Sequence, residues 1–227
     1  MYSVKSKSTS SRGGNRKRSQ RTTRRSTSSS FTQHRYKRPT LPTANTVLVV
    51  DASHSMQGEL VCPDGQKISK RDAAVEAAVL LVKHKAANCP QDLLGCVGFG
   101  SRPFVVSPLT RASHPKLVKR LHGLRLCGMT DMSGGLRLGI SLLSNRPARF
   151  LRNLVLLSDG YPDVRSGLMG LAREAKRARI NIHTIGIGDR TSLDEVLLQR
   201  ISAETHRGRY QHVTSLQELA IALQGVG

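Results

Sequence analysis

VLVVDASHSMQG, residues 47 to 58, joins a strand-like apolar run to a cluster of polar side chains. Its first four residues are apolar without alternation, which is typical of a parallel strand buried on both faces. The run ends at Asp51, and Ser53 and Ser55 follow at alternate positions. Taken alone, this cluster is compatible with a metal site, a nucleophile or a helix cap.

Strand-like and helix-like segments alternate along the rest of the chain. Strands are predicted at 46–51, 93–100, 102–109, 152–160, 180–189 and 209–213. Helices are predicted at 70–87, 114–124, 132–144, 166–179, 192–205 and 215–223, the last two capped by Ser192 and Ser215. Residues 57–70 are expected to form a polar loop with a turn at Pro63-Asp64-Gly65.

The pattern predicts an α/β fold with a doubly wound, mostly parallel six-stranded sheet and helices on both faces. The 102–109 segment follows its predecessor after almost no connection. A parallel crossover needs a dozen or more residues, so this strand must pair antiparallel. Its prolines suit an edge. The sequence therefore predicts one antiparallel edge strand.

The first 42 residues differ in composition from the rest. They carry 12 Lys and Arg and no Asp or Glu, whereas residues 43–227 carry 24 basic and 15 acidic residues. Such a segment buries too little apolar surface to offset its ordering entropy, so we expect a disordered basic tail over residues 1–42. It is compatible with nucleic acid, an anionic membrane face or an acidic protein, or with no specific partner.

Membrane-span, signal and cysteine patterns predict the cellular compartment of the protein. No apolar run approaches the about 20 residues of a membrane span, and the N-terminus lacks the apolar core of a secretory signal. The four cysteines show no metal-ligand spacing, and reduced thiols are expected at Cys62, Cys89, Cys96 and Cys127. We expect a cytoplasmic protein, with organelle targeting through the Arg- and Ser-rich N-terminus as the alternative.

The candidate site follows from the sheet. In such sheets the ligand site lies beyond the carboxyl ends of the strands, and two predicted strands end in Asp51 and Asp159. A third loop, 127–135, carries Thr130 and Asp131 just before a helix. Apart from His54, the donors are all oxygen atoms. That set suits Mg²⁺ or Mn²⁺ better than zinc.

Three segments then carry a family resemblance. DASHS at 51–55, Thr130 in a Gly-Met-Thr-Asp loop and SDG at 158–160 resemble the metal-ion-dependent adhesion site of von Willebrand factor A domains, whose motif begins Asp-x-Ser-x-Ser. The resemblance covers roughly residues 44–224, and we expect one such domain over residues 43–227. It implies a divalent cation held by Asp51, Ser53, Ser55, Thr130 and Asp159, with one position open for an acidic residue of a partner.

The resemblance also narrows the class of partner. The segments DASHSM and SDGYPD are more similar to intracellular, bacterial-type members of the family than to integrin domains. Among those members, they resemble the corresponding domain of magnesium chelatase subunits. This implies a partner of the AAA+ ATPase class. One departure is His54, which stands where the family usually has glycine. An outward imidazole is the plain interpretation; a partner contact or a pH effect is the other.

Competing chemistries fit less well. A serine hydrolase would need glycines around its nucleophile, and here the flanks of Ser53 and Ser55 are bulkier. An Asp-x-Asp phosphotransferase motif, a Gly-x-Gly-x-x-Gly loop and a P-loop are all absent from the sequence. Singly, each site residue is compatible with a cap or a turn. We therefore predict a metal-dependent interaction module rather than an enzyme, with a nucleic-acid-associated protein anchored by residues 1–42 as the alternative.

Overall fold

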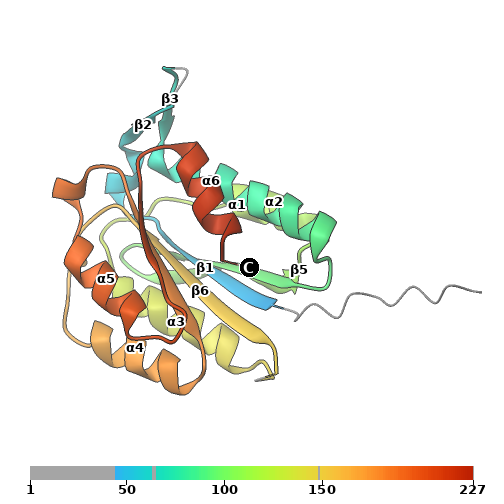
Figure 1. Ribbon diagram of the computed structural model, residues 1–227. Coiled ribbons are helices and arrows are strands. Elements are labelled where there is room, and N and C mark those ends of the chain that lie inside the picture. Colours follow the sequence, from blue (N-terminus) through green and yellow to red (C-terminus); the bar gives the residue numbers. More distant parts are fainter. Residues whose placement is uncertain (1–43, 63–64, 148, 227) are drawn as a thin grey trace, which may run out of the picture. The chain divides into compact units, whose positions relative to one another are not determined.

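The computed structural model describes residues 44–62, 65–147 and 149–226. The predicted tail over residues 1–42 and the Pro63-Asp64 part of the predicted turn lie outside these ranges. A central sheet lies between two layers of helices (Figure 1). Its strands are β1 (Ala44–Asp51), β4 (Leu93–Phe99), β5 (Pro103–Arg111), β6 (Leu151–Ser158), β7 (Asn181–Ile187) and β8 (Tyr210–Val213).

The strand order is β5-β4-β1-β6-β7-β8, and only the β4–β5 pair is antiparallel. This confirms the predicted six-stranded, mostly parallel sheet with an antiparallel edge strand. The chain leaves β1 toward β4 on one side and later returns to β6 on the other. The order therefore reverses at β1, which places a crevice at the carboxyl ends of β1 and β6.

Helices cover both faces of the sheet (Figure 1). One face carries α1 (Lys70–Asn88), α2 (Lys116–His122) and α6 (Leu216–Gln224). The other carries α3 (Met132–Ser144), α4 (Leu168–Arg177) and α5 (Glu195–Ala203). β1 contributes to both cores because its side chains alternate between faces: Leu48 and Val50 point one way, Val47 and Val49 the other.

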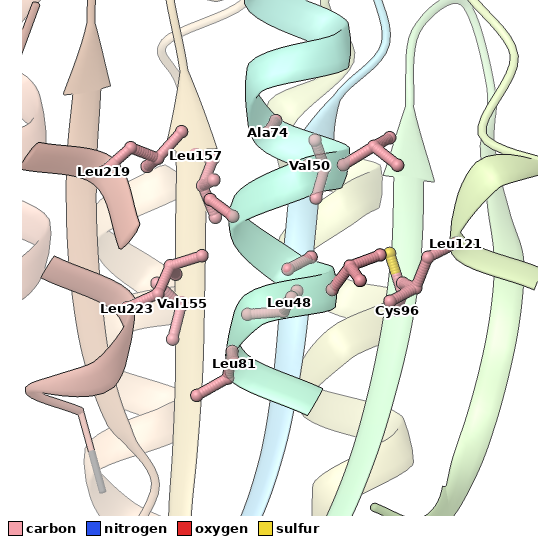
Figure 2. Packing of buried hydrophobic residues seen from close by; sticks show 14 of the residues in the cluster. Leu48, Val50, Ala74, Leu81, Cys96, Leu121, Val155, Leu157, Leu219 and Leu223 are labelled. Atoms are coloured by element: carbon pink, nitrogen blue, oxygen red, sulfur yellow. The ribbon is translucent and has the colours of Figure 1, made fainter. Parts of the chain in front are cut away.

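Figure 2 shows how the first of these cores is filled. Ala74 and Leu81 of α1 pack over β1, and Leu219 of α6 lies beside Leu157 of β6. Cys96 is also buried here, as its apolar surroundings in the sequence predict. Helix α1 faces this core with small side chains, those of Ala73, Ala74, Ala77 and Ala78.

Two local predictions are wrong. The predicted loop 57–70 contains a hairpin of β2 (Glu59–Val61) and β3 (Lys67–Ser69), because Leu60 alternates with exposed neighbours and is buried. The predicted helix 192–205 begins later than expected: Ser192 ends the 3-10 turn η2 (Arg190–Ser192), and α5 starts at Glu195. Its cap is Asp194, whose side chain accepts from Leu197 N–H, and not Ser192. The Ser215 cap of α6 is confirmed, since its side chain accepts from Glu218 N–H.

Candidate functional site

Two buried carboxylates lie at the centre of the candidate site. Asp51 is the last residue of β1, and Asp159 directly follows β6. The two strands are parallel neighbours, with Val50 in register with Leu157, so both carboxylates reach the same edge of the sheet. Asp51 is 0% and Asp159 1% exposed. Buried carboxylates need hydrogen bonds or a cation to offset their desolvation.

A continuous hydrogen-bond network connects these carboxylates through the serines. Asp51 Oδ1 accepts from Ser53 N–H at 2.9 Å, and the Ser53 and Ser55 hydroxyls lie 2.8 Å apart. Ser55 Oγ then donates to Asp159 Oδ1 at 2.7 Å. On the other side Ser158 Oγ donates to Asp51 Oδ2 at 2.8 Å. Four of the five predicted site residues are thus brought together, and Ser158 is an addition.

The turn after β1 places the hydroxyl groups of Ser53 and Ser55 next to each other. Residues His54–Gln57 form the 3-10 turn η1, in which Met56 N–H donates to Ser53 O. Met56 is fully buried and anchors this turn to the core. Ser55 and His54 remain exposed while Ser53 is buried. The network therefore runs from a buried end at Asp51 to a solvent-accessible end at Ser55.

Thr130 is positioned by its loop. His54 N–H donates to Gly128 O at 3.1 Å and Cys127 N–H to Ala52 O at 2.6 Å, so backbone bonds join this loop to the serine turn. Thr130 N–H donates to Asp163 Oδ2 at 2.7 Å, and Asp163 N–H donates back to Thr130 O at 3.3 Å. Helix α3 is capped by Asp131 rather than Thr130, which leaves the Thr130 hydroxyl without a capping role.

Lys70 is a site residue that the sequence analysis missed. Its Nζ lies 2.7 Å from Asp159 Oδ2, and its side chain is only 13% exposed. It passes close to two glycines, since a Cβ on Gly188 would come within 2.8 Å of Lys70 Cε and one on Gly58 within 3.4 Å. A signal was present: Lys70 is the first residue of α1, where a positive charge opposes the helix dipole.

The electrostatics of the two carboxylates differ. Burial raises the pKa of Asp51 to about 6, although hydrogen bonds from Ser53 and Ser158 lower it, and the charge of Asp159 adds to the rise. Asp159 has the Lys70 ammonium as its cationic partner. Within the described residues, Asp51 forms no ion pair. A positive charge close to Asp51 would therefore stabilise its ionised form.

The donor set fits a hard divalent cation. Within the described part of the chain, no three His, Cys, Asp or Glu side chains are grouped as metal ligands, so a metal here depends on hydroxyl oxygens as well. Ser53, Ser55 and the two carboxylates supply oxygen atoms of the kind that Mg²⁺ and Mn²⁺ accept.

In residues 44–62, 65–147 and 149–226, no helix has the length and apolarity that a membrane crossing requires.

Known proteins are similar to this chain in sequence or in fold. Residues 46–162 match the model of the von Willebrand factor type A domain. Inter-alpha-trypsin inhibitor heavy chain H1 of Mesocricetus auratus is 29% identical over 198 residues, which cover 80% of this chain and 20% of that protein. The chain thus spans about a fifth of the length of this curated relative.

Solved structures of low sequence identity share the fold. A von Willebrand factor type A protein from Catenulispora acidiphila superposes with a TM-score of 0.68 at 19% identity, covering 81% of this chain and 42% of that one. The SpRpn10 VWA domain superposes with a TM-score of 0.65 at 20% identity, covering 82% of this chain and 100% of that one. The pilus adhesin SpaC of Lactobacillus rhamnosus GG, in its open conformation, superposes with a TM-score of 0.65 at 17% identity, covering 82% of this chain and 30% of that one. With more than half of its residues matched by the family model, this chain belongs to the von Willebrand factor type A domain family.

Proposed function

We propose that this domain binds a partner protein through a divalent cation, Mg²⁺ or Mn²⁺, held by Asp51, Ser53, Ser55, Thr130 and Asp159. Domains of this family are typically adhesion or protein–protein interaction modules. The observation that carries the proposal is the network from Asp51 through Ser53 and Ser55 to Asp159, which gathers oxygen donors from two strands far apart in sequence.

The charge balance favours an acidic group on the partner. Two carboxylates face the proposed ion, and Lys70 already neutralises one of them. A divalent ion held otherwise by neutral hydroxyls therefore keeps net positive charge and attracts an incoming Asp or Glu. The exposed end of the network at Ser55, next to exposed His54, is where such a group would arrive.

Exposed apolar side chains around the site favour a protein partner. Met129 precedes Thr130 and is 62% exposed, while Tyr161 and Val164 follow Asp159 and are 50% and 58% exposed. Large apolar residues next to a charged centre are typical of the contact region of an interface. We propose an AAA+ ATPase as the partner class, on the resemblance of DASHSM and SDGYPD to chelatase-type domains.

The test is binding of a short peptide with a central Glu, followed through the backbone amide signals of Ser53, Ser55 and Thr130 by NMR. With saturating Mg²⁺, we expect the Glu peptide to shift these signals and an otherwise identical Gln peptide to leave them unchanged. Equal shifts from both peptides, or shifts that persist in chelator, would refute metal-mediated docking. Ser144→Ala should respond to the Glu peptide like the wild type, because Ser144 Oγ donates to Ile140 O at the end of α3 opposite Asp131.

A further inference from the structure

The amino ends of β6, β7 and β8 meet at the edge of the sheet opposite the metal site, because the three strands are parallel neighbours. Arg152 is the second residue of β6, Arg179 precedes β7, and Arg207 and Arg209 precede β8. Three of these arginines, Arg152, Arg179 and Arg207, line an open pocket of about 530 Å³ together with Arg149. Phe150 and His206 are among its other lining residues.

This arginine pocket has no carboxylate in its lining. A smaller pocket of about 150 Å³, which Arg209 helps to line, adjoins it through Leu151 and Arg207. Among the described residues, none of the five arginines forms an ion pair with Asp or Glu. Their mutual repulsion is therefore uncompensated, and an anionic ligand would relieve it.

Arg152 shows that the pocket is more than a solvated basic surface. The residue is 6% exposed, and its Nε has no hydrogen-bond partner among the described residues. A buried cationic donor without a partner is costly, and native structures rarely keep one without a ligand or water to satisfy it. The residue also lines the pocket, so its guanidinium charge lies beside any anion bound there.

Arg179 gives a second, independent indication. It has φ +55°, a left-handed conformation that is strained for a side-chain-bearing residue and is usually occupied by glycine or asparagine after a helix. Its N–H donates to Lys176 O at the end of α4, so the position is a helix terminus where glycine would serve better for folding. Strain that persists at a pocket points to a role in binding.

We propose that this arginine pocket binds the phosphodiester backbone of single-stranded nucleic acid. Several unpaired arginines over two adjoining pockets match a ligand with repeated phosphates better than a peptide with one phosphate. Phe150 supplies an aromatic ring, with the Arg149 guanidinium 4.9 Å from its centroid, and such pairs stack on unpaired bases. The chain enters β1 at Ala44, in register with Leu151 of the pocket, and the basic sequence 1–42 precedes it.

The experiment must separate this pocket from the basic N-terminal sequence, so it reads out individual arginines in the full chain. Modification by phenylglyoxal is followed by mass spectrometry with and without a short oligouridylate. We expect Arg149, Arg179 and Arg207 to react at least about threefold more slowly with the oligonucleotide, because guanidinium groups bonded to phosphate are shielded from the reagent. Arg102, Arg125 and Arg137, all exposed and outside the pocket, are the internal reference. Unchanged rates at the three pocket arginines would overturn the proposal.

Variants test the same pocket through affinity. Arg149→Gln with Arg207→Gln should lower the slope of log K against log salt by about 1.4, at about 0.7 per phosphate contact on a single strand. Arg102→Gln with Arg137→Gln has the same net charge and should leave the slope near the wild-type value. Equal slopes for the two double variants would contradict a pocket-specific site. Protection of the pocket by a phosphoserine peptide but not by the oligonucleotide would assign it to a different ligand and overturn the proposal.

Arg179→Gly separates binding from folding. Glycine adopts φ +55° without strain, so we expect the melting temperature to stay the same or rise. Oligouridylate affinity should nevertheless fall, because a guanidinium group is lost from the pocket. A variant that gains stability and binds like the wild type would show that Arg179 does not contact the ligand.

Discussion

Lys70 Nζ lies 2.7 Å from Asp159 Oδ2, so one of the two buried carboxylates of the site already has a cation beside it. The ammonium is held in place because α1 begins at Lys70 and because Gly58 and Gly188 leave room for the side chain. A divalent ion bound by Asp159 therefore meets a competing positive charge. In the proposed metal site, Lys70 would therefore weaken the binding of the ion.

Lys70→Met is expected to strengthen divalent-metal binding by about tenfold or more, corresponding to about 1.4 kcal/mol, because the competing ammonium is gone. The same change should destabilise the metal-free protein by on the order of 3 kcal/mol, since Asp159 is left buried without a cation. Melting temperatures in chelator and in excess Mg²⁺ measure both effects. The rise in melting temperature on adding Mg²⁺ should exceed that of the wild type.

Lys67→Met is the matched control for Lys70→Met. Lys67 pairs with Glu59, but both side chains are more than half exposed, so this pair contributes little. We expect neither metal affinity nor stability to change. If Lys70→Met instead weakened metal binding, Lys70 would be a support for Asp159 rather than a competitor of the ion.

Asp163→Ala tests the positioning of Thr130. The variant removes the carboxylate that accepts from Thr130 N–H, which should cost about 0.5–1.5 kcal/mol of stability and loosen the loop. Metal affinity should fall several-fold if Thr130 is a ligand. Glu218→Ala is a matched control, since it also removes a carboxylate that accepts a backbone N–H, that of Thr214. Equal metal affinity in both variants would remove Thr130 from the ligand set.

His183 makes folding stability depend on pH. Burial, with the charge of Arg209 adding to it, lowers the pKa of His183 from 6.5 to about 4. The stabilisation is complete above pH 6.5 and is lost as the pH falls toward 4, because only the unfolded chain takes up the proton. When the pH falls from 7 to 5, the contribution of His183 to the free energy of unfolding should therefore decrease by about 2 kcal/mol.

Urea unfolding at pH 7 and pH 5 measures this loss. In His183→Gln, the difference in the free energy of unfolding between pH 7 and pH 5 should be smaller than in the wild type by about 2 kcal/mol. His122→Gln, a change at an exposed histidine, should behave like the wild type. An undiminished deficit in His183→Gln would assign the pH dependence to another group.

The sheet was predictable because its strands are nearly continuous apolar runs and because the short 99–103 connection allows only an antiparallel neighbour. The positions of Asp51 and Asp159 followed from strand ends alone. The hairpin at β2 and β3 was missed because each strand has three residues, too few for a clear alternation. Lys70 was missed because its role depends on contacts with Asp159 and Gly188, which lie about 90 and 120 residues away and meet only in the folded chain.

The assignment of Ser192 as a cap failed for a related reason. Asp194 lies two residues further on, and its carboxylate accepts from Leu197 N–H while it also pairs with Arg165. A charged acceptor at a helix N-terminus is favoured by the helix dipole, so it displaces the serine as the cap. Local preferences alone did not distinguish the two residues.

Whether the site binds a metal ion is tested by a titration of Mn²⁺ into the full chain, with free Mn²⁺ followed by electron paramagnetic resonance. The wild type should bind one ion saturably, and Mg²⁺ should displace it. The Ser53→Ala, Ser55→Ala double variant should bind at least about tenfold more weakly, and Ser144→Ala should match the wild type. Equal binding by the wild type and the double variant, or no saturable binding by either, would contradict the claim that this network holds a metal ion.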